Sequence, residues 1–462
     1  MKSLTEHYAE FAMQLRAEDI PSEVKERVSD LILDTLGVGI AGSDSPPAVM
    51  ARRSMKGQTS FKEATLWGTK ERSSVYSAAL VNGTASHAYD YDDTHNWAEI
   101  HISGVLVPCL LALGEKMRIP GRKIIEAYTA AYEVTARIGV VGNAKILYGK
   151  GFHCTGLGGP FGAALASGIV MGLDKSELVN ALGIAGSFSS GLLEFQSDGS
   201  MTKRLHPGVA SWHGMTAAAL AKEGFTGPAT ILEGKKGWLN AFSGDFSRID
   251  SATKGLGDYF EILETHVKIY PCISGFSASI ECLLILMEKY QLLPEQIESM
   301  DVGVRDLTFT WVRPPTEIPQ TILSAQMNLA YCLAVAAYDQ QVKLAQFSED
   351  RLKDPKVLAL MQRIKISPDQ ELTDLNKQDS VCLPGRVTIK TKDGQHYQHQ
   401  LNYAKDSRGN RASRAELEEK FFGLTRSYIG DRRSKKIAKK IYELEQMEDV
   451  GKIAKLCGAP TG

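Results

Sequence analysis

Gly159-Pro-Phe-Gly-Ala-Ala-Leu-Ala-Ser-Gly-Ile-Val-Met-Gly172 is the stretch that decides the fold of this chain. Its apolar residues recur at helical spacing, and its glycines and alanines allow a neighbouring helix to approach closely. Residues 104–118 and 123–139 share this composition, and residues 207–222 form another such segment. We therefore predict that this half of the chain is a compact helical bundle and not an array of βαβ units.

The helical pattern extends outward from this bundle in both directions. Ile20-Pro-Ser22 opens a helix, and another begins at Val75. The polar, irregular residues between them, 43–72, are expected to form a surface connection. Asp174-Lys-Ser-Glu177 is a capping box, which marks the start of a further helix.

A different pattern begins after about residue 260. Met300-Asp-Val-Gly-Val-Arg305 and Arg386-Val-Thr-Ile-Lys-Thr391 alternate with period two, and residues 395–401 complete a hairpin with the second of them. Two helices are expected between these strands, at 274–290 and 322–338. This mixture predicts a smaller α+β domain.

The chain returns to helix near residue 405. Ser413-Arg-Ala-Glu416 is a second capping box, and residues 432–446 form a basic amphipathic helix whose cations are expected to be solvated.

Because 462 residues exceed what one hydrophobic core usually supports, we expect two domains.

Composition excludes several classes of protein. An apolar fraction of 43% with a net charge of −1 is ordinary for a soluble protein and gives no general attraction to nucleic acid or anionic membranes. The seven cysteines form no CxxC pair, which favours reduced thiols in the cytosol. The longest nearly apolar run, 104–114, is shorter than the roughly 20 residues of a membrane helix. We expect a cytoplasmic protein without nucleic-acid or membrane partners.

One short stretch concentrates groups that move protons or bind cations: His87, Asp90, Asp92, Asp93, Thr94, His95, Glu99 and His101. Buried charge costs several kcal/mol unless it is paired, so this density is hard to explain as core filler. The residues alone leave open a metal site, a metal-free acid/base site and a solvated acidic loop. Because no HExxH, EF-hand or thiolate quartet is present, we predict no metal.

Candidate partners for this stretch lie downstream. His153 stands in a glycine-rich approach to a helix, whose N-terminus favours an anion. Lys203 and His206 precede a helix expected to begin at Pro207, which suits a carboxylate or phosphate. Lys268 lies near the expected domain boundary, where ligand clefts tend to occur. These groups favour the acid/base interpretation.

Three segments resemble the signature segments of the MmgE/PrpD family: His87-Ala-Tyr-Asp-Tyr-Asp-Asp-Thr94, Asp198-Gly-Ser-Met-Thr-Lys-Arg-Leu-His-Pro-Gly208 and Lys268-Ile-Tyr-Pro-Cys272. The family includes 2-methylcitrate dehydratase, cis-aconitate decarboxylase and iminodisuccinate epimerase. The resemblance implies a mainly α fold and a homodimer. Its large helical domain, built from both chain ends, would span 1–265 and 405–462, and its α+β lid domain would span 266–404.

Matched residue by residue, the active-site positions of the decarboxylase branch fall on Asp90, Thr94, His101, His153, Lys203, Lys268 and Tyr331. The resemblance implies that His101 and His153 carry protons, that the two lysines and His206 hold carboxylates, and that Asp90 orients a histidine. Thr94 and Tyr331 would donate hydrogen bonds to substrate. His95 is the alternative to His101, while Asp92, Asp93 and His95 are otherwise expected only to shape the turn.

The expected function is that of a cofactor-free lyase acting on a small di- or tricarboxylate. The reaction would be cis-aconitate-type decarboxylation to itaconate or citrate/2-methylcitrate-type dehydration. Asp92 stands where the dehydratase branch typically has Asn, which favours decarboxylation. An iminodisuccinate epimerase-like isomerase is the alternative within the family. A non-catalytic carboxylate-binding protein and a metalloenzyme are the alternatives from other classes.

Overall fold

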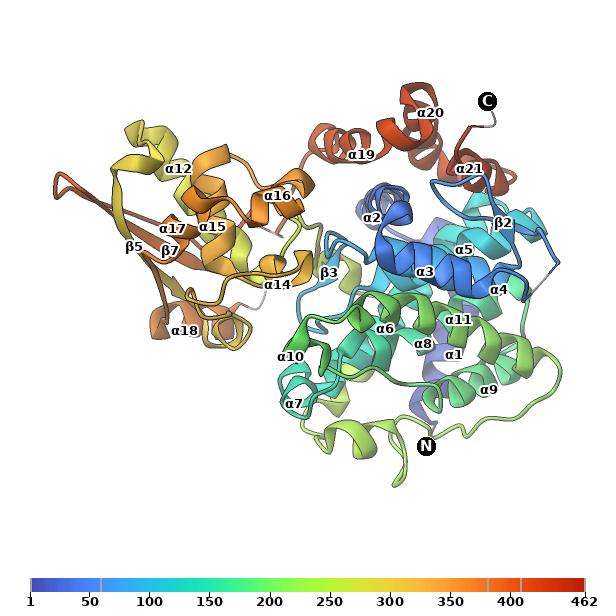
Figure 1. Ribbon diagram of the computed structural model, residues 1–462. Coiled ribbons are helices and arrows are strands. Elements are labelled where there is room, and N and C mark those ends of the chain that lie inside the picture. The colour runs from blue at the N-terminus through green and yellow to red at the C-terminus, as the bar shows by residue number, and fades with distance from the viewer. Residues whose placement is uncertain (1, 59, 380–381, 408, 461–462) are drawn as a thin grey trace. The chain divides into compact units, whose positions relative to one another are not determined.

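The computed structural model describes residues 2–58, 60–379, 382–407 and 409–460, and it is mainly α-helical, as predicted (Figure 1). The chain forms two compact units. The first comprises Met1–Ala88, Asp92–Thr265 and Ser413–Gly462, and the second comprises Tyr89–Tyr91 and His266–Ala412. A three-residue piece of the acidic stretch thus belongs to a different unit from the residues on either side of it.

The first unit is a helical bundle around α8 (Cys154–Met171), as the opening stretch predicts. Helices α5 (Ile102–Met117), α6 (Gly121–Gly142) and α11 (Thr202–Lys222) pack directly against α8. Close approach depends on small residues, since a Cβ added at Gly214 of α11 would lie 2.3 Å from the Ala163 Cβ of α8. The predicted bundle is therefore confirmed.

Helix α8 is long and apolar enough to cross a membrane by length and composition. However, 94% of it is buried inside the protein, where α5, α6 and α11 cover it. Its apolar composition is therefore explained by its place at the centre of the bundle.

Helix α4 (Val75–Ser86) crosses α11 at a pair of glycines close to the candidate site. A Cβ added at Gly83 would lie 2.6 Å from the Gly208 Cα, and one added at Gly208 would lie 2.2 Å from the Leu80 carbonyl oxygen. Backbone therefore meets backbone at this crossing, which positions the last turn of α4 beside the first turns of α11.

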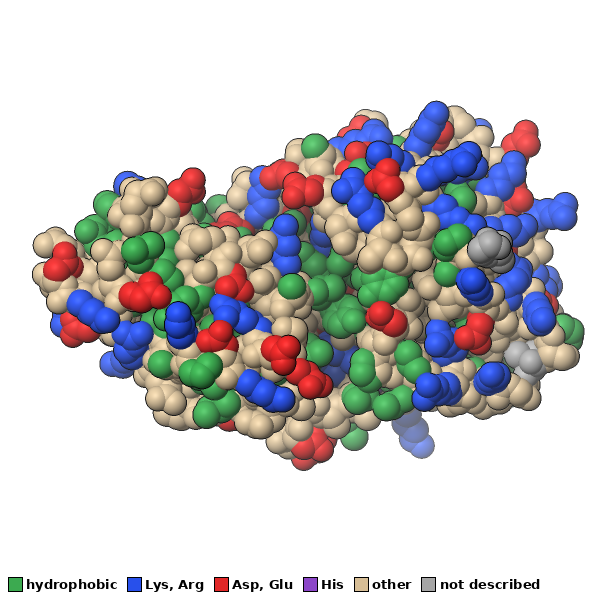
Figure 2. All heavy atoms as spheres, turned by 45° about the horizontal axis from the view of Figure 1, so that its top comes forward, with side chains coloured by type: hydrophobic (Ala, Val, Ile, Leu, Met, Phe, Trp, Pro, Cys, Tyr) green, Lys and Arg blue, Asp and Glu red, His purple; other side chains and the backbone are tan. Residues whose placement is uncertain are grey.

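Helices from both chain ends complete the first unit. Capping boxes begin α9 and α19 at Asp174 and Ser413, as predicted. The remaining elements are α1 (Leu4–Gln14), α2 (Ser22–Ala41), α7 (Ala144–Gly149), α9 (Lys175–Gly186), α10 (Phe195–Asp198), α19 (Arg414–Ile429), α20 (Asp431–Tyr442), α21 (Gly451–Leu456) and the two-residue strands β1 (Ala64–Thr65), β2 (Arg72–Ser73) and β3 (Thr94–His95). Helix α20 buries Ile437 and Ile441 and turns its cations to solvent. Figure 2 shows Lys and Arg side chains interspersed with Asp and Glu on the surface.

Two expectations for the first unit are wrong. Residues 43–72 contain a helix, α3 (Pro46–Met55), which begins with two prolines and ends with two arginines, both favourable at those ends. Helix α11 begins at Thr202 and not at Pro207. Proline lacks a backbone N–H, but near a helix N-terminus this removes few intrahelical hydrogen bonds. The helix can therefore begin before the proline, at Thr202.

The second unit contains a four-stranded sheet with the order β6-β5-β7-β8. Strands β7 (Gly385–Thr391) and β8 (His396–Leu401) form the predicted antiparallel hairpin, and β5 (Ile297–Val304) pairs antiparallel with β7. The sequence did not predict β6 (Ile364–Pro368), which pairs parallel with β5. The sequence of β6, Ile364-Lys-Ile-Ser-Pro368, also alternates apolar and polar residues, so a short period-two signal was present here.

Helices cover this sheet and form the core of the second unit with it (Figure 1). Helix α12 (Ser277–Tyr290) packs against the hairpin, and α15 (Leu329–Asp339) packs against α12. The helix expected at 322–338 is interrupted because the Asn328 side chain caps α15 by accepting from the Tyr331 N–H. Shorter elements complete the unit: β4 (Thr265–His266) at its start, α13 (Asp306–Phe309), α14 (Ile322–Gln326), α16 (Glu349–Leu352), α17 (Pro355–Met361) and α18 (Gln370–Gln378).

Candidate functional site

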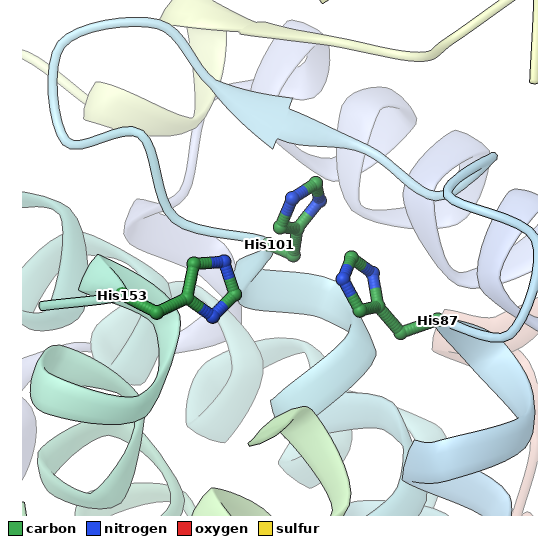
Figure 3. Close-up of side chains that lie close together, drawn as sticks. All are labelled: His87, His101 and His153. Carbon is green, nitrogen blue, oxygen red and sulfur yellow. The ribbon is translucent and has the colours of Figure 1, made fainter. Parts of the chain in front are cut away.

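Four histidines from four helix ends lie together in the first unit. His87 is the C-cap residue of α4, His101 and His153 are the N-cap residues of α5 and α8, and His206 lies near the start of α11. The ring centroids are 4.4 Å apart for His87–His101, 6.3 Å for His101–His153 and 5.0 Å for His153–His206. Figure 3 shows the first three converging from separate elements. The fold therefore assembles a buried imidazole cluster from residues far apart in the chain.

The hydrogen bonds of His87 and His101 define which ring nitrogen carries the proton. The His87 Nδ1 lies 2.9 Å from a carboxylate oxygen of Asp92, and the His101 Nδ1 lies 2.9 Å from the Asp93 carbonyl oxygen. Both partners only accept, so both Nδ1 atoms donate, and Nε2 is the basic nitrogen of each neutral ring. Asp92 also lies 3.4 Å from the His101 Nδ1. The Asp92 carboxylate therefore lies close to both imidazole rings.

His153 and His206 form a second pair with a different electrostatic character. Their Nδ1 atoms are 2.8 Å apart, so one ring donates to the other. Burial, together with the positive charge of His206 and Lys203, lowers the pKa of His153 well below its usual range. Burial and Lys203 also lower the pKa of His206 to about 4. Both rings are therefore neutral near pH 7, and the expected proton-carrying role of His153 stays a prediction.

Positive charge enters the site from α11. Lys203 and Arg204 occupy the first turn of this helix, and both are buried. The Arg204 guanidinium donates to the His87 carbonyl oxygen at 3.3 Å. The N-termini of α5, α8 and α11 contribute their partial positive charge to the same region. The structure thus brings Lys203 and His206 to the cluster, in an environment that favours an anion.

His95 and His101 are separated clearly by their partners. The His95 Nδ1 accepts the Ala98 N–H at 3.1 Å, and its Nε2 lies 3.2 Å from a carboxylate oxygen of Glu261. The buried His101 instead joins His87 and His153, and Thr94 Oγ1 lies 3.3 Å from its Nδ1. Of the two histidines considered from the sequence, His101 is the one that the fold brings to the cluster.

Asp90 and Lys268 belong to the second unit and pair with each other. The Lys268 ammonium contacts the Asp90 carboxylate and donates to its carbonyl oxygen at 3.1 Å, and both side chains are buried. Asp90 has a left-handed backbone with φ 53°, which aspartate tolerates better than most residues. The carboxylate that bonds the His87 Nδ1 at 2.9 Å is that of Asp92, and the expected role of Asp90 in orienting a histidine stays a prediction.

Tyr331 lies in the core of the second unit. Its side chain is fully buried on α15, and its hydroxyl donates to the Gln346 carbonyl oxygen at 2.6 Å. The expected hydrogen bond to substrate is thus replaced by one that ties α15 to a neighbouring turn.

Replacing Tyr331 by phenylalanine is therefore expected to leave kcat within about threefold of wild type and to lower stability by about 1 kcal/mol, the net value of one buried hydrogen bond. Steady-state rates and urea midpoints measure the two effects. A hundredfold loss of kcat with unchanged stability would instead show that the Tyr331 hydroxyl contributes to the reaction, as the resemblance implies.

Asp93 is a buried carboxyl group behind the histidine cluster. Ser103 Oγ donates to its Oδ2 at 2.8 Å, and Tyr132 lies 3.4 Å from the same oxygen. Among the described residues, Oδ1 has no hydrogen-bond partner. Burial, with the nearby charge of Asp92, raises the pKa of Asp93 to about 8. Asp93 is therefore mostly protonated at pH 7.

The raised pKa predicts a pH-dependent stability. Between pH 4 and 8 the folded state holds a proton on Asp93 that the unfolded state releases, so stability falls as pH rises, by at most about 1.4 kcal/mol per pH unit from this group. Asp93→Asn should remove this pH-dependent contribution. The free energy of unfolding of the variant should therefore increase relative to that of wild type from pH 5 to pH 8. Urea unfolding midpoints of both proteins at four pH values measure this difference. If the midpoints of the two proteins changed equally with pH, the raised pKa of Asp93 would be contradicted.

Sequence reasoning missed two members of the site, His87 and Asp92. Both stand in the quoted acidic stretch, five residues apart. The segment between α4 and α5 is irregular, apart from β3, so no periodicity indicates which side chains face one another. The available signal was the His-x₄-Asp spacing within a signature segment.

The chain is similar to known proteins over almost its whole length. The chain matches the MmgE/PrpD N-terminal domain over residues 6–248 and the MmgE/PrpD C-terminal domain over residues 270–444. It is 28% identical to a cis-aconitate decarboxylase of Aspergillus terreus, over 99% of this chain and 96% of that protein. It is 26% identical to the human cis-aconitate decarboxylase, over 100% of this chain and 96% of that protein.

Proposed function

Because the chain belongs to the MmgE/PrpD family, we propose that it is a cofactor-independent lyase of small tricarboxylates, with cis-aconitate as the first candidate substrate and itaconate as the product. The family and the names of the relatives indicate a lyase-type enzyme. The observation that carries the proposal is the buried cluster of His87, His101 and His153 beside Asp92 and Lys203.

The reaction sets clear chemical demands. Breaking the bond between a methylene carbon and its carboxylate releases CO₂ and leaves an electron pair. That pair shifts through the double bond to the carbon beside a second carboxylate, where it takes up one proton. The enzyme must therefore hold the remaining carboxylates, stabilise negative charge as it moves, and deliver one proton to carbon.

The residues of the first unit supply these functions. The Nδ1 atoms of His87 and His101 bond to Asp92 and to the Asp93 carbonyl oxygen, so either ring, once protonated, can present Nε2–H as the proton donor. Thr94 helps to hold His101. Lys203 and the three helix N-termini hold carboxylates, and the neutral pair His153–His206 offers hydrogen bonds. The roles of Asp90 and Lys268 toward substrate rest on the sequence resemblance.

A substrate comparison tests the proposal. Purified protein is incubated with cis-aconitate, 2-methylcitrate or iminodisuccinate in D₂O and followed by NMR. The expected product from cis-aconitate is itaconate carrying one deuterium on the carbon that received the proton. Turnover of 2-methylcitrate alone would identify a dehydratase, and deuterium exchange into iminodisuccinate alone would identify an epimerase. Binding of all three without turnover would identify the non-catalytic alternative.

The assembly and cellular location are part of the same proposal. We expect a homodimer, as the family resemblance implies, and a cytoplasmic protein. Sedimentation velocity at micromolar protein concentration measures the first, and fractionation of cells producing the protein measures the second. A monomer at all accessible concentrations would contradict the dimer.

A further inference from the structure

We propose that His87, His101 and His153 also form a coordination site for one divalent transition-metal ion of the Zn²⁺ class, and that the bound ion inhibits the enzyme. The sequence contains no metal-binding motif, so only the assembled fold places these ligands together. Imidazole nitrogen is a preferred ligand of Zn²⁺, Ni²⁺ and Cu²⁺. Figure 3 shows the three rings arranged around a common centre.

The distances among the three rings suit a single ion. One nitrogen of each ring lies within 4.8 Å of the others. Three such atoms can all lie within about 2.8 Å of one point, and Zn–N bonds are about 2.0–2.1 Å, so shifts of about 0.7 Å per ring would complete coordination.

The surroundings of each ring match those of metal-bound histidines. Such histidines commonly use their second nitrogen to bond a carboxylate, a carbonyl or another polar group, which fixes ring orientation. The Nδ1 atoms of His87, His101 and His153 contact the Asp92 carboxylate, the Asp93 carbonyl and His206, respectively. Because Nδ1 of each ring is engaged in this way, we assign Nε2 as the ligand atom, and three protein ligands leave a fourth position for water or a substrate carboxylate.

The charges near the cluster act in opposite directions. Lys203 opposes a cation, while Asp92, in contact with His87 and His101, favours one. A bound ion would occupy the Nε2 atoms assigned above to proton delivery, and it would therefore block turnover. Inhibition rests on the proposed function, whereas metal binding does not.

Binding is tested directly with Zn²⁺ by calorimetry and with Co²⁺ by its visible absorption. One equivalent per chain is expected, with at least about tenfold weaker binding in His101→Ala and in His153→Ala. His396→Ala, on the exposed side of β8, is the matched control and should bind as wild type does. No bound equivalent in wild type, or equal binding in all four proteins, would overturn the proposal.

A second variant covers the case in which the alanine variants do not fold. Asp92→Asn keeps all three ligands but alters the partner of His87, and it is expected to weaken Zn²⁺ binding about 10- to 100-fold. Unchanged affinity in the folded variant would overturn the site. Inhibition is then measured at buffered free Zn²⁺, because tricarboxylates chelate the ion. Zn²⁺ binding without any turnover would contradict only the proposed function, and uninhibited turnover at saturating Zn²⁺ would contradict the inhibitory site.

Discussion

Replacing His101 by alanine is expected to lower kcat about 1000-fold, within the range that a positioned general acid contributes. His101 donates through Nδ1 to the Asp93 carbonyl oxygen and lies beside the Asp92 carboxylate, so Nε2 is the nitrogen that would carry the transferred proton. Alanine removes that proton and leaves the carboxylate in place. Steady-state rates with the substrate identified by NMR measure the loss, and circular dichroism verifies the fold.

His95→Gln is the matched control for this experiment. His95 is as buried as His101, but its nitrogens face Ala98 and Glu261. Glutamine retains polar groups for these partners, so kcat should stay within about threefold of wild type, while stability falls by about 1 kcal/mol. The opposite result, with His101→Ala active and His95→Gln inactive, would transfer the catalytic role to His95 and disprove the assignment of the site.

Replacing Gly208 by alanine is expected to destabilise the first unit by about 3 kcal/mol, the upper part of the usual range for overpacking. The added Cβ would lie 2.2 Å from the Leu80 carbonyl oxygen and 2.9 Å from the Thr84 backbone nitrogen. Both atoms belong to the backbone of α4, so neither moves without shifting the helix. Because α11 carries Lys203 and His206, activity should fall as well. Urea unfolding followed by circular dichroism measures the stability change.

Gly423→Ala provides the control at another helical glycine. Gly423 lies in α19, and a Cβ added there meets nothing within 4 Å. Alanine should therefore stabilise the protein by about 0.4–1 kcal/mol, because it restricts the unfolded chain and favours helix. Equal effects at the two positions would show that helix propensity, and not the crossing of α4 and α11, controls the result at Gly208.

Local patterns predicted most of the fold because they act over a few residues. Helical spacing identified α5, α6 and α8, capping boxes identified the starts of α9 and α19, and alternation identified the hairpin of β7 and β8. Two elements differed from the prediction. Strand β6, which has a short alternating sequence, pairs parallel with β5, and α11 begins before its proline, with Lys203 and Arg204 of its first turn buried.

The sequence by itself determined the helical bundle, the family resemblance and the residue types available for chemistry. It could not determine which neighbours in the acidic stretch act together. Between α4 and α5 the backbone is irregular and turns left-handed at Asp90, so residue spacing does not define side-chain direction. Only the tertiary structure turned His87, Asp92 and His101 toward His153, and His95 toward Glu261. The physical reason is that each orientation is set by a hydrogen-bond partner: Asp92 and Asp93 in the irregular segment for His87 and His101, and the distant residues His206 and Glu261 for His153 and His95.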